Sequence, residues 1–79
     1  MPYIPSKDRD RAAVMPGTPG ELNYAITDLC VDYLAGTEKR YADRAEVIGA
    51  LECAKLEFYR RALAEYEDAA IAKNGDVCP

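Results

Sequence analysis

The sequence predicts an all-α fold, an antiparallel hairpin of two helices over about residues 19–35 and 43–73. The second stretch contains no proline and a single glycine, Gly49. As one continuous helix it would be about 45 Å long at 1.5 Å per residue. Residues 37–42 form a polar connector of a length that usually joins antiparallel helices. We therefore expect a helical hairpin and tail over 18–79, preceded by a proline-containing N-terminal arm.

The N-terminal arm, residues 1–17, leaves two alternatives open. Its opening MPYIP should be extended, because a proline disfavours helix in the residue before it. Ser6 could then cap a short helix over residues 7–14. The alternating charges of this segment give it little apolar face, so a solvated arm is the other alternative.

The first hairpin helix has clear start and stop signals. Thr18 fits an N-cap, Pro19 the first helical position, and Glu21 the far end of a capping box. Gly36 is a natural stop. Apolar residues repeat at the spacing of one buried helix face; they are Leu22, Ala25, Ile26, Leu29, Tyr33 and Leu34.

The long helix should begin at a cap by Asp43, with Glu46 completing a second capping box. Lys73 in its last turn and the following Asn74-Gly75 mark its end. Small residues at 45, 49 and 53 share one face, which suggests that another helix crosses there closely. Cys53 would then be a small buried hydrophobe.

The long helix carries more apolar residues than one partner helix could cover. One stripe holds Val47, Leu51, Ala54, Phe58 and Ala62, and an adjacent one holds Ile48, Tyr59, Leu63, Tyr66 and Ala70, with Leu56 further round. The first helix, about 25 Å long, would cover little more than half of this length. We therefore expect a single small domain, residues 1–79, that forms a homo-oligomeric helical bundle by burying the C-terminal half of the long helix.

Composition argues against most kinds of chemistry. The chain has no histidine, and its three cysteines, Cys30, Cys53 and Cys78, form no CxxC pair. A metal site, a disulfide framework and a catalytic thiol are therefore not expected. No phosphate-binding loop, dinucleotide fingerprint or catalytic triad pattern is present. The expectation is a protein that is not an enzyme and needs no cofactor.

Charge and hydropathy restrict the partners. The net charge is −4, with acidic and basic residues mixed along the chain. A domain without a basic stripe is a poor DNA binder, because that affinity comes from neutralising phosphates. No apolar run approaches the length of about 18 residues that a membrane span needs. We expect a cytoplasmic protein with neither DNA nor membrane as a partner.

The best candidate for a binding site is the EFYRR segment of the long helix. Arginine forks beside aromatic rings suit a phosphate together with a stacked base. Asn23 and Tyr24 lie near the positive end of the first helix, which also favours anions. The candidate residues are thus Asn23, Tyr24, Glu57, Tyr59, Arg60, Arg61 and Tyr66. The alternative is a solvated face, on which Glu57 pairs with the two arginines at i+3 and i+4.

Three runs carry a resemblance: PGELNYAIT (19–27), IGALECAKLEFYRR (48–61) and YEDAAIAKNGDV (66–77). Together with the opening MPYIP, they resemble a small uncharacterised family of phages, prophages and bacterial genomes. The sequence differs from that family between residues 9 and 19, where the family has a longer helical segment, and at its Cys-Pro end. The resemblance implies a phage or mobile-element setting, in the cytoplasm of a host cell.

Two functions remain open. One is a helical oligomer whose intersubunit pockets bind a nucleotide-like anion, which in a phage setting would suit a sponge for a signalling nucleotide of host defence. The other is a protein-interaction module, an inhibitor or adaptor that lays its long helix against a host protein. A structural role in the virion is a third and weaker hypothesis beside these two.

Overall fold

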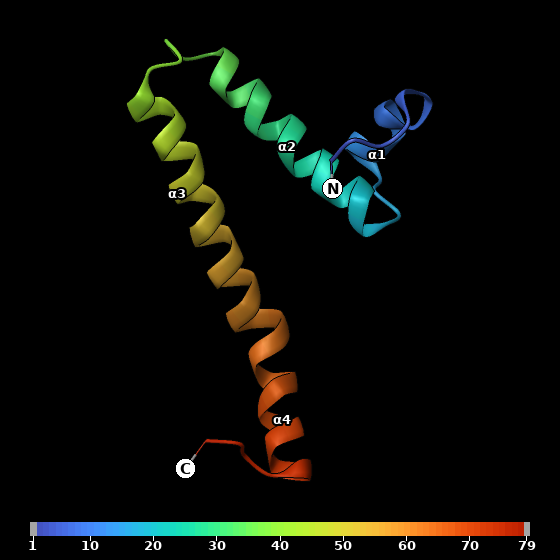
Figure 1. The fold of residues 1–79 in the computed structure, drawn as a ribbon, viewed down its shortest axis with the longest axis vertical. Helices are drawn as coiled ribbons and strands as arrows, with labels where there is room; N and C mark the ends of the chain where they lie inside the picture. Colours follow the sequence, from blue (N-terminus) through green and yellow to red (C-terminus); the bar gives the residue numbers. More distant parts are fainter. Residues whose placement is uncertain (1, 79) are drawn as a thin grey trace. The chain divides into compact units, whose positions relative to one another are not determined.

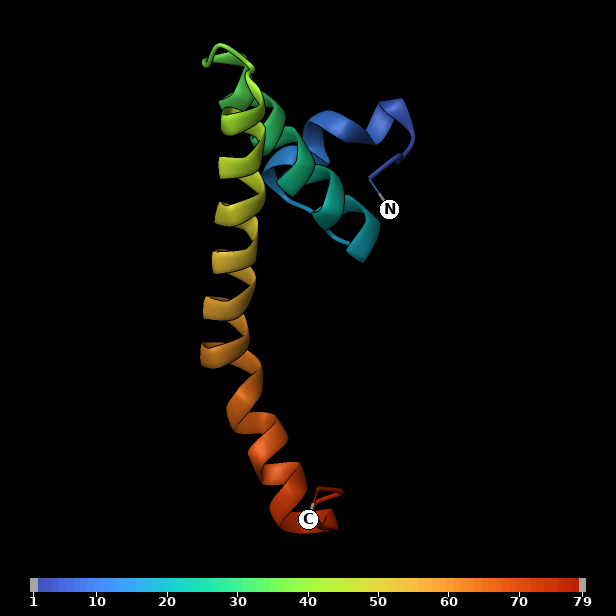
Figure 2. The same ribbon diagram turned by 60° about the vertical axis from the view of Figure 1, so that its left-hand side comes forward.

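The computed structural model describes residues 2–78, and every regular element within that range is helical (Figures 1 and 2). The all-α prediction is thus confirmed, as is the order of helix, short connector and helix. The elements are η1 (Ser6–Asp8), α1 (Arg9–Val14), α2 (Pro19–Ala35), α3 (Tyr41–Phe58), η2 (Tyr59–Leu63) and α4 (Ala64–Asn74). The chain divides into two compact units after Val47, and each is described by itself.

The N-terminal arm contains the short helix that was one of the two alternatives. Pro5 precedes a 3₁₀ turn, in which the Asp8 N–H donates to the Pro5 carbonyl over 3.0 Å. Helix α1 follows directly. Its Ala12 is 0% exposed and is the buried apolar side chain of the part that the structure describes. One alanine is a small core, so polar contacts must hold this segment in place.

Helix α1 packs against α2 (Figure 2). An ion pair between Arg11 and Glu21 joins the two helices. Arg11 binds both carboxylate oxygens of Glu21 through its two Nη atoms, over 2.9 and 2.6 Å. The backbone N–H of Gly17 donates to the same carboxylate over 2.9 Å. Glu21 therefore joins α1, the loop after it and the first turn of α2.

The predicted buried face of α2 is largely exposed, which corrects the expectation from the apolar spacing. Leu22 is 51% and Leu29 71% exposed, and Ile26 and Tyr33 are also exposed. The reason is that α1 packs around Glu21, Tyr24 and Ala25, which are half-buried, and of these three only Ala25 belongs to the predicted face. Charge pairing, rather than the apolar stripe, decides which side of α2 is covered.

The caps of α2 are partly as predicted. The Glu21 N–H donates to Thr18 Oγ1 over 3.1 Å, so Thr18 is the N-cap. The second hydrogen bond of a capping box, from the Thr18 N–H to the Glu21 carboxylate, was predicted wrongly. That carboxylate accepts from Gly17 and Arg11 instead. The helix ends before Gly36 as predicted, but with φ of −84° rather than a left-handed conformation. The last turn tightens instead, with the Gly36 N–H donating to Tyr33 over 3.1 Å.

The long helix begins two residues earlier than predicted, at Tyr41. Asp43 is not its cap. It lies in the first turn, where its Oδ2 accepts the backbone N–H of Arg40 over 3.0 Å. A carboxylate at this position satisfies a donor that the helix end leaves free, which is the role predicted for Glu46. Asp43 is accordingly buried, at 7% exposure.

A π-helical turn, η2, interrupts the long helix at Tyr59–Leu63, a feature that the sequence did not predict. The ribbon nevertheless continues without a break from α3 through η2 into α4 (Figure 1). The long helix ends at Asn74-Gly75, as predicted. Gly75 has φ of 92°, and its N–H donates to the Ile71 carbonyl over 2.8 Å.

Gly49 and Cys53, two of the small residues in α3, are open to their surroundings in the part of the chain that the structure describes. A Cβ built on Gly49 would meet no atom within 4 Å among the described residues. Cys53, expected to be buried, is exposed. Within the second unit, no helix therefore crosses α3 closely at Gly49.

Lys39, in the connector, adopts φ of 59°, a conformation that favours glycine. Its N–H donates to Thr37 Oγ1 over 3.1 Å and its carbonyl accepts from Arg44, and glycine would keep both bonds. We expect Lys39→Gly to raise the free energy of unfolding by about 0.5–1 kcal/mol in urea denaturation. Glu38→Gly, next to it, relieves no positive φ and should lower that free energy. Equal effects of the two variants would contradict this account of Lys39.

The Arg11 ion pair and the Gly17 N–H lower the pKa of Glu21 from its ordinary value of 4.5. A lowered folded-state pKa contributes stability above pH 4.5, which is lost as the pH falls through the folded-state value. We expect Glu21→Gln to have a lower Tm than the wild type at pH 7, with the difference disappearing at strongly acidic pH. Arg11→Gln should flatten the same pH dependence. A Tm difference that is equally large at both pH values would show that Glu21 acts through packing alone.

Candidate functional site

The candidate site residues fall into two groups. Asn23 and Tyr24 lie in α2, within the first unit, whereas Glu57, Tyr59 and the residues up to Tyr66 lie in the second. Each group is built by different local contacts.

In the first group, Tyr24 is half-buried beneath a guanidinium group. The Arg9 Cζ lies 5.8 Å from the centre of the Tyr24 ring, a cation–π distance, and Arg9 Nε donates to the Ile4 carbonyl over 3.2 Å. Asn23 is exposed, and its backbone carbonyl accepts the Thr27 hydroxyl over 2.8 Å. Arg9 was not predicted as a partner of Tyr24, because residues fifteen positions apart in different helices leave no local signal in the sequence.

The start of α2 is not the open anion site that the sequence suggested. Glu21 already places its own carboxylate there, where it accepts the Gly17 N–H and pairs with Arg11. An anion from outside would have to displace this carboxylate. The start of α2 therefore does not give Asn23 and Tyr24 a free, positively polarised helix end at which an anion could bind.

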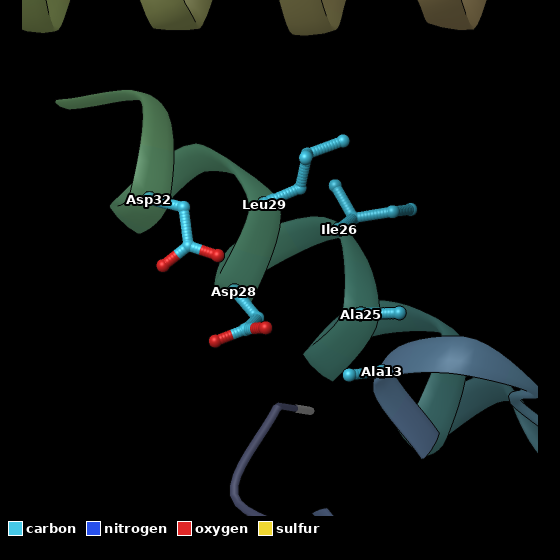
Figure 3. A pocket seen from close by; sticks show the side chains of 6 residues that line it. All are labelled: Ala13, Ala25, Ile26, Asp28, Leu29 and Asp32. Carbon is cyan, nitrogen blue, oxygen red and sulfur yellow. The ribbon is translucent and has the colours of Figure 1, made fainter. Parts of the chain in front are cut away.

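A shallow hollow of about 340 Å³ lies beside α2 (Figure 3). It is lined by Ala13, Ala25, Ile26, Asp28, Leu29 and Asp32. The carboxylates of Asp28 and Asp32 extend to one side of α2, and Ile26 and Leu29 to another (Figure 3). Two carboxylates would repel an anion, so this hollow does not suit the predicted ligand.

In the second group, Glu57 forms ion pairs with two arginines. Arg60 Nη2 donates to both carboxylate oxygens of Glu57, over 2.9 and 3.0 Å, and Arg61 Nε donates to Oε1 over 2.5 Å. These are the i+3 and i+4 pairs that the sequence predicted. The hydrogen bond from Arg61, and then that from Arg60, lowers the pKa of Glu57. The Glu57 carboxylate neutralises one of the two guanidinium charges, which leaves the cluster one positive charge.

The π turn carries three of the candidate residues, Tyr59, Arg60 and Arg61. Tyr59 is 47% exposed, and Tyr66, in α4, is more exposed still. The structure thus brings Glu57, Arg60 and Arg61 into direct contact and places Tyr59 next to them in the chain. This YRR cluster, residues 57 and 59–61, is an open surface rather than an enclosed pocket.

Side chains suited to metal binding do not gather in the part of the chain that the structure describes. No three Cys, Asp or Glu residues of that part lie close enough to hold a metal ion. Cys30 is half-buried, and Cys53 and Cys78 are exposed. Within residues 2–78, no helix has the length and apolar character required to cross a membrane.

Fold and site together define a small all-α protein with exposed apolar helix faces and one compact arginine cluster. The chain belongs to the family described as Domain of unknown function (DUF6899), which it matches over residues 1–77. Neither a curated protein nor a solved structure matches it. The resemblance to an uncharacterised family is thereby confirmed at this level, over nearly the whole chain.

Proposed function

We propose that the protein is a non-enzymatic helical homo-oligomer that binds a compact, anionic, nucleotide-like ligand between its subunits. The observation that carries the proposal is the YRR cluster, in which two guanidinium groups converge on Glu57 and an exposed tyrosine, Tyr59, adjoins them in the chain. Arginine forks match the geometry of phosphate oxygens, and an aromatic ring offers a stacking surface for a base. The cluster's one excess positive charge suits an anion.

Self-association is supported by the apolar surface. Ile48 is 66% and Phe58 72% exposed, while Ala12 is the buried apolar residue of the described chain. A chain of this size has too small a core to be stable alone without additional support. Soluble monomers rarely expose apolar patches of this extent. A second copy is the simplest cover for stripes that run along α3 and α4.

An oligomer would also complete the site. Ligand pockets usually enclose most of the surface of a small ligand, and an open helix face cannot do so alone. A neighbouring subunit packed on the apolar stripes would supply the opposite wall beside Tyr59 and Tyr66. The same packing would exclude water from the arginines and strengthen their interaction with a phosphate.

The phage setting implied by the resemblance gives this binding a biological use. A protein that binds a signalling nucleotide tightly and does not convert it lowers the free concentration of that nucleotide. No catalytic group is required for such an activity. We propose an anti-defence sponge in the host cytoplasm as the role of the family member described here.

A protein-interaction module is the second candidate. It is favoured by the length of the exposed stripes, which run from Ile48 to Ile71 and would suit a groove on another protein. In this alternative the arginines would form charged contacts at the edge of the interface with the other protein. The two candidates differ in whether a small nucleotide binds to the purified protein.

The proposal requires self-association. We expect a mass of at least twice the monomer's 8.7 kDa at micromolar concentration, measured by sedimentation equilibrium or light scattering. Phe58→Asp, which puts a charge in an exposed stripe, should shift the mass toward the monomer while the far-ultraviolet circular dichroism stays helical. Glu65→Ala, at an exposed polar position of α4, serves as the control. A monomeric wild type would contradict the proposal.

Ligand binding is tested by melting shifts with a panel of mononucleotides and of cyclic mono-, di- and trinucleotides. A ligand at about 100 times its Kd stabilises the native state by about 2.7 kcal/mol. We expect one class to raise the Tm by about 10 °C or more, and Arg60→Ala/Arg61→Ala to abolish the shift while remaining oligomeric. If no nucleotide shifts the wild type, and the double variant retains activity in cells, the interaction module is the better account.

A further inference from the structure

The second unit consists of one helix, which runs from Ile48 through η2 to Asn74. Residues 48–63 of this helix are all exposed. As far as the structure describes this unit, no other element of it packs against the helix. Most helical stability in proteins comes from packing an apolar face against a partner, rather than from the helix itself. The second unit therefore needs a partner along its apolar face.

Two charged residues lie inside this apolar face. At about 100° per residue, and with one residue added by the π turn, Lys55 lies about 40° and Glu67 about 60° round the helix from Leu51. Exposed apolar side chains border them on both sides, Phe58 on one and Ile71 on the other. A purely apolar partner that covered this face would bury both charges without a counter-charge, which is costly.

The spacing of these two charges fits a second copy of the same helix. Lys55 precedes Arg61 by six residues, and Glu67 follows it by six. In an antiparallel pair whose two-fold axis passes at Arg61, Lys55 of each copy lies level with Glu67 of the other. A parallel pair would instead place each of these residues level with its own copy, where like charges repel. Charge complementarity thus favours the antiparallel pair.

Both charges are available for such a contact. The Lys55 Nζ donates to Glu52 Oε1 over 3.3 Å, and the lysine side chain is 70% exposed. An ammonium group has three donors, so Lys55 can also bind a second carboxylate. Glu67 is exposed, and within the described residues it takes part in no ion pair.

We propose that the protein self-associates by antiparallel pairing of its long helices, with Lys55 of each copy against Glu67 of the other. This inference rests on the homo-oligomer of the proposed function and assigns its interface. In the same register Leu51 of one copy lies level with Ile71 of the other, so apolar side chains face each other beyond the charges. The partner that covers the face is thus a second copy of this chain.

A charge-reversal titration tests the pairing. Lys55→Glu and Glu67→Lys each place like charges in both contacts, so each variant alone should self-associate about tenfold more weakly than the wild type. Lys55→Glu is then labelled on Cys53, in a Cys30→Ser/Cys78→Ser background, and titrated at trace concentration with Glu67→Lys. We expect an affinity close to that of the wild type, because both contacts again join opposite charges. Fluorescence-detected sedimentation measures the Kd.

The matched control titrates the same labelled chain with Asp68→Lys. Asp68 is exposed and lies about 100° round the helix from Glu67, outside the apolar face. The change of charge is identical, so any general attraction between oppositely charged chains is the same in both titrations. Asp68→Lys should bind the labelled chain at least about threefold more weakly than Glu67→Lys does. Equal affinities would overturn the pairing of Lys55 with Glu67.

Energy transfer between separately labelled chains tests the orientation. Cys53 and Ala72 both lie on the side of the helix opposite Leu51, so labels there leave the face free. In the proposed register, Cys53 of one copy and Ala72 of the other are about 5 Å apart along the axis, whereas the two copies of Cys53 are about 24 Å apart. In a parallel pair these values become about 28 Å and zero.

We therefore expect more transfer from a donor on Cys53 to an acceptor on Ala72→Cys, in a chain whose other cysteines are serine, than between two chains labelled on Cys53. The opposite order would overturn the antiparallel arrangement. An oligomer that fails both tests would overturn this interface and leave the homo-oligomer of the proposed function standing. A monomeric wild type would instead contradict the homo-oligomer itself, so the two failures are distinguishable.

Discussion

Glu21 carries the contact on which the first unit depends. Its carboxylate receives two donors from Arg11 and one from Gly17, while its own N–H is bound by Thr18. The helices it joins share little apolar surface, since Ala12 is the buried apolar side chain of the described chain. A charged contact at the start of α2 therefore determines where α1 lies and which face of α2 is left for other partners.

Short-range sequence signals predicted most of the helix ends, but not which helix faces are covered by other parts of the chain. The all-α class, the cap at Thr18 and the end at Gly75 follow from side chains within a few residues of one another, where propensity and capping dominate. The covered face of α2 depends on Arg11 and Glu21, ten residues apart in the chain, and could not be read from periodicity. The start of the long helix was misplaced because a carboxylate can satisfy a helix end from the cap or from within the first turn.

In the candidate site too, contacts between residues close in the chain were predicted, and contacts between distant residues were not. The pairing of Glu57 with Arg60 and Arg61 follows from helical spacing and was predicted, but the donor atoms that each arginine uses could not be. The stacking of Arg9 on Tyr24 joins two helices and left no trace in the sequence pattern. Exposure of the apolar stripes was expected from the mismatch in helix lengths, and the family match extends over these same segments.

The π turn at Tyr59–Leu63 has a consequence for the phase of the long helix. A π turn takes up one residue more than an α-helical turn, so the residues after it lag by one position, about 100° of rotation. The stripe that passes through Leu51, Ala54 and Phe58 therefore continues through Tyr66 and Ala70, where an uninterrupted helix would present Glu65 and Ala69. One extra residue thus aligns a tyrosine, instead of a glutamate, with the apolar line of the preceding helix.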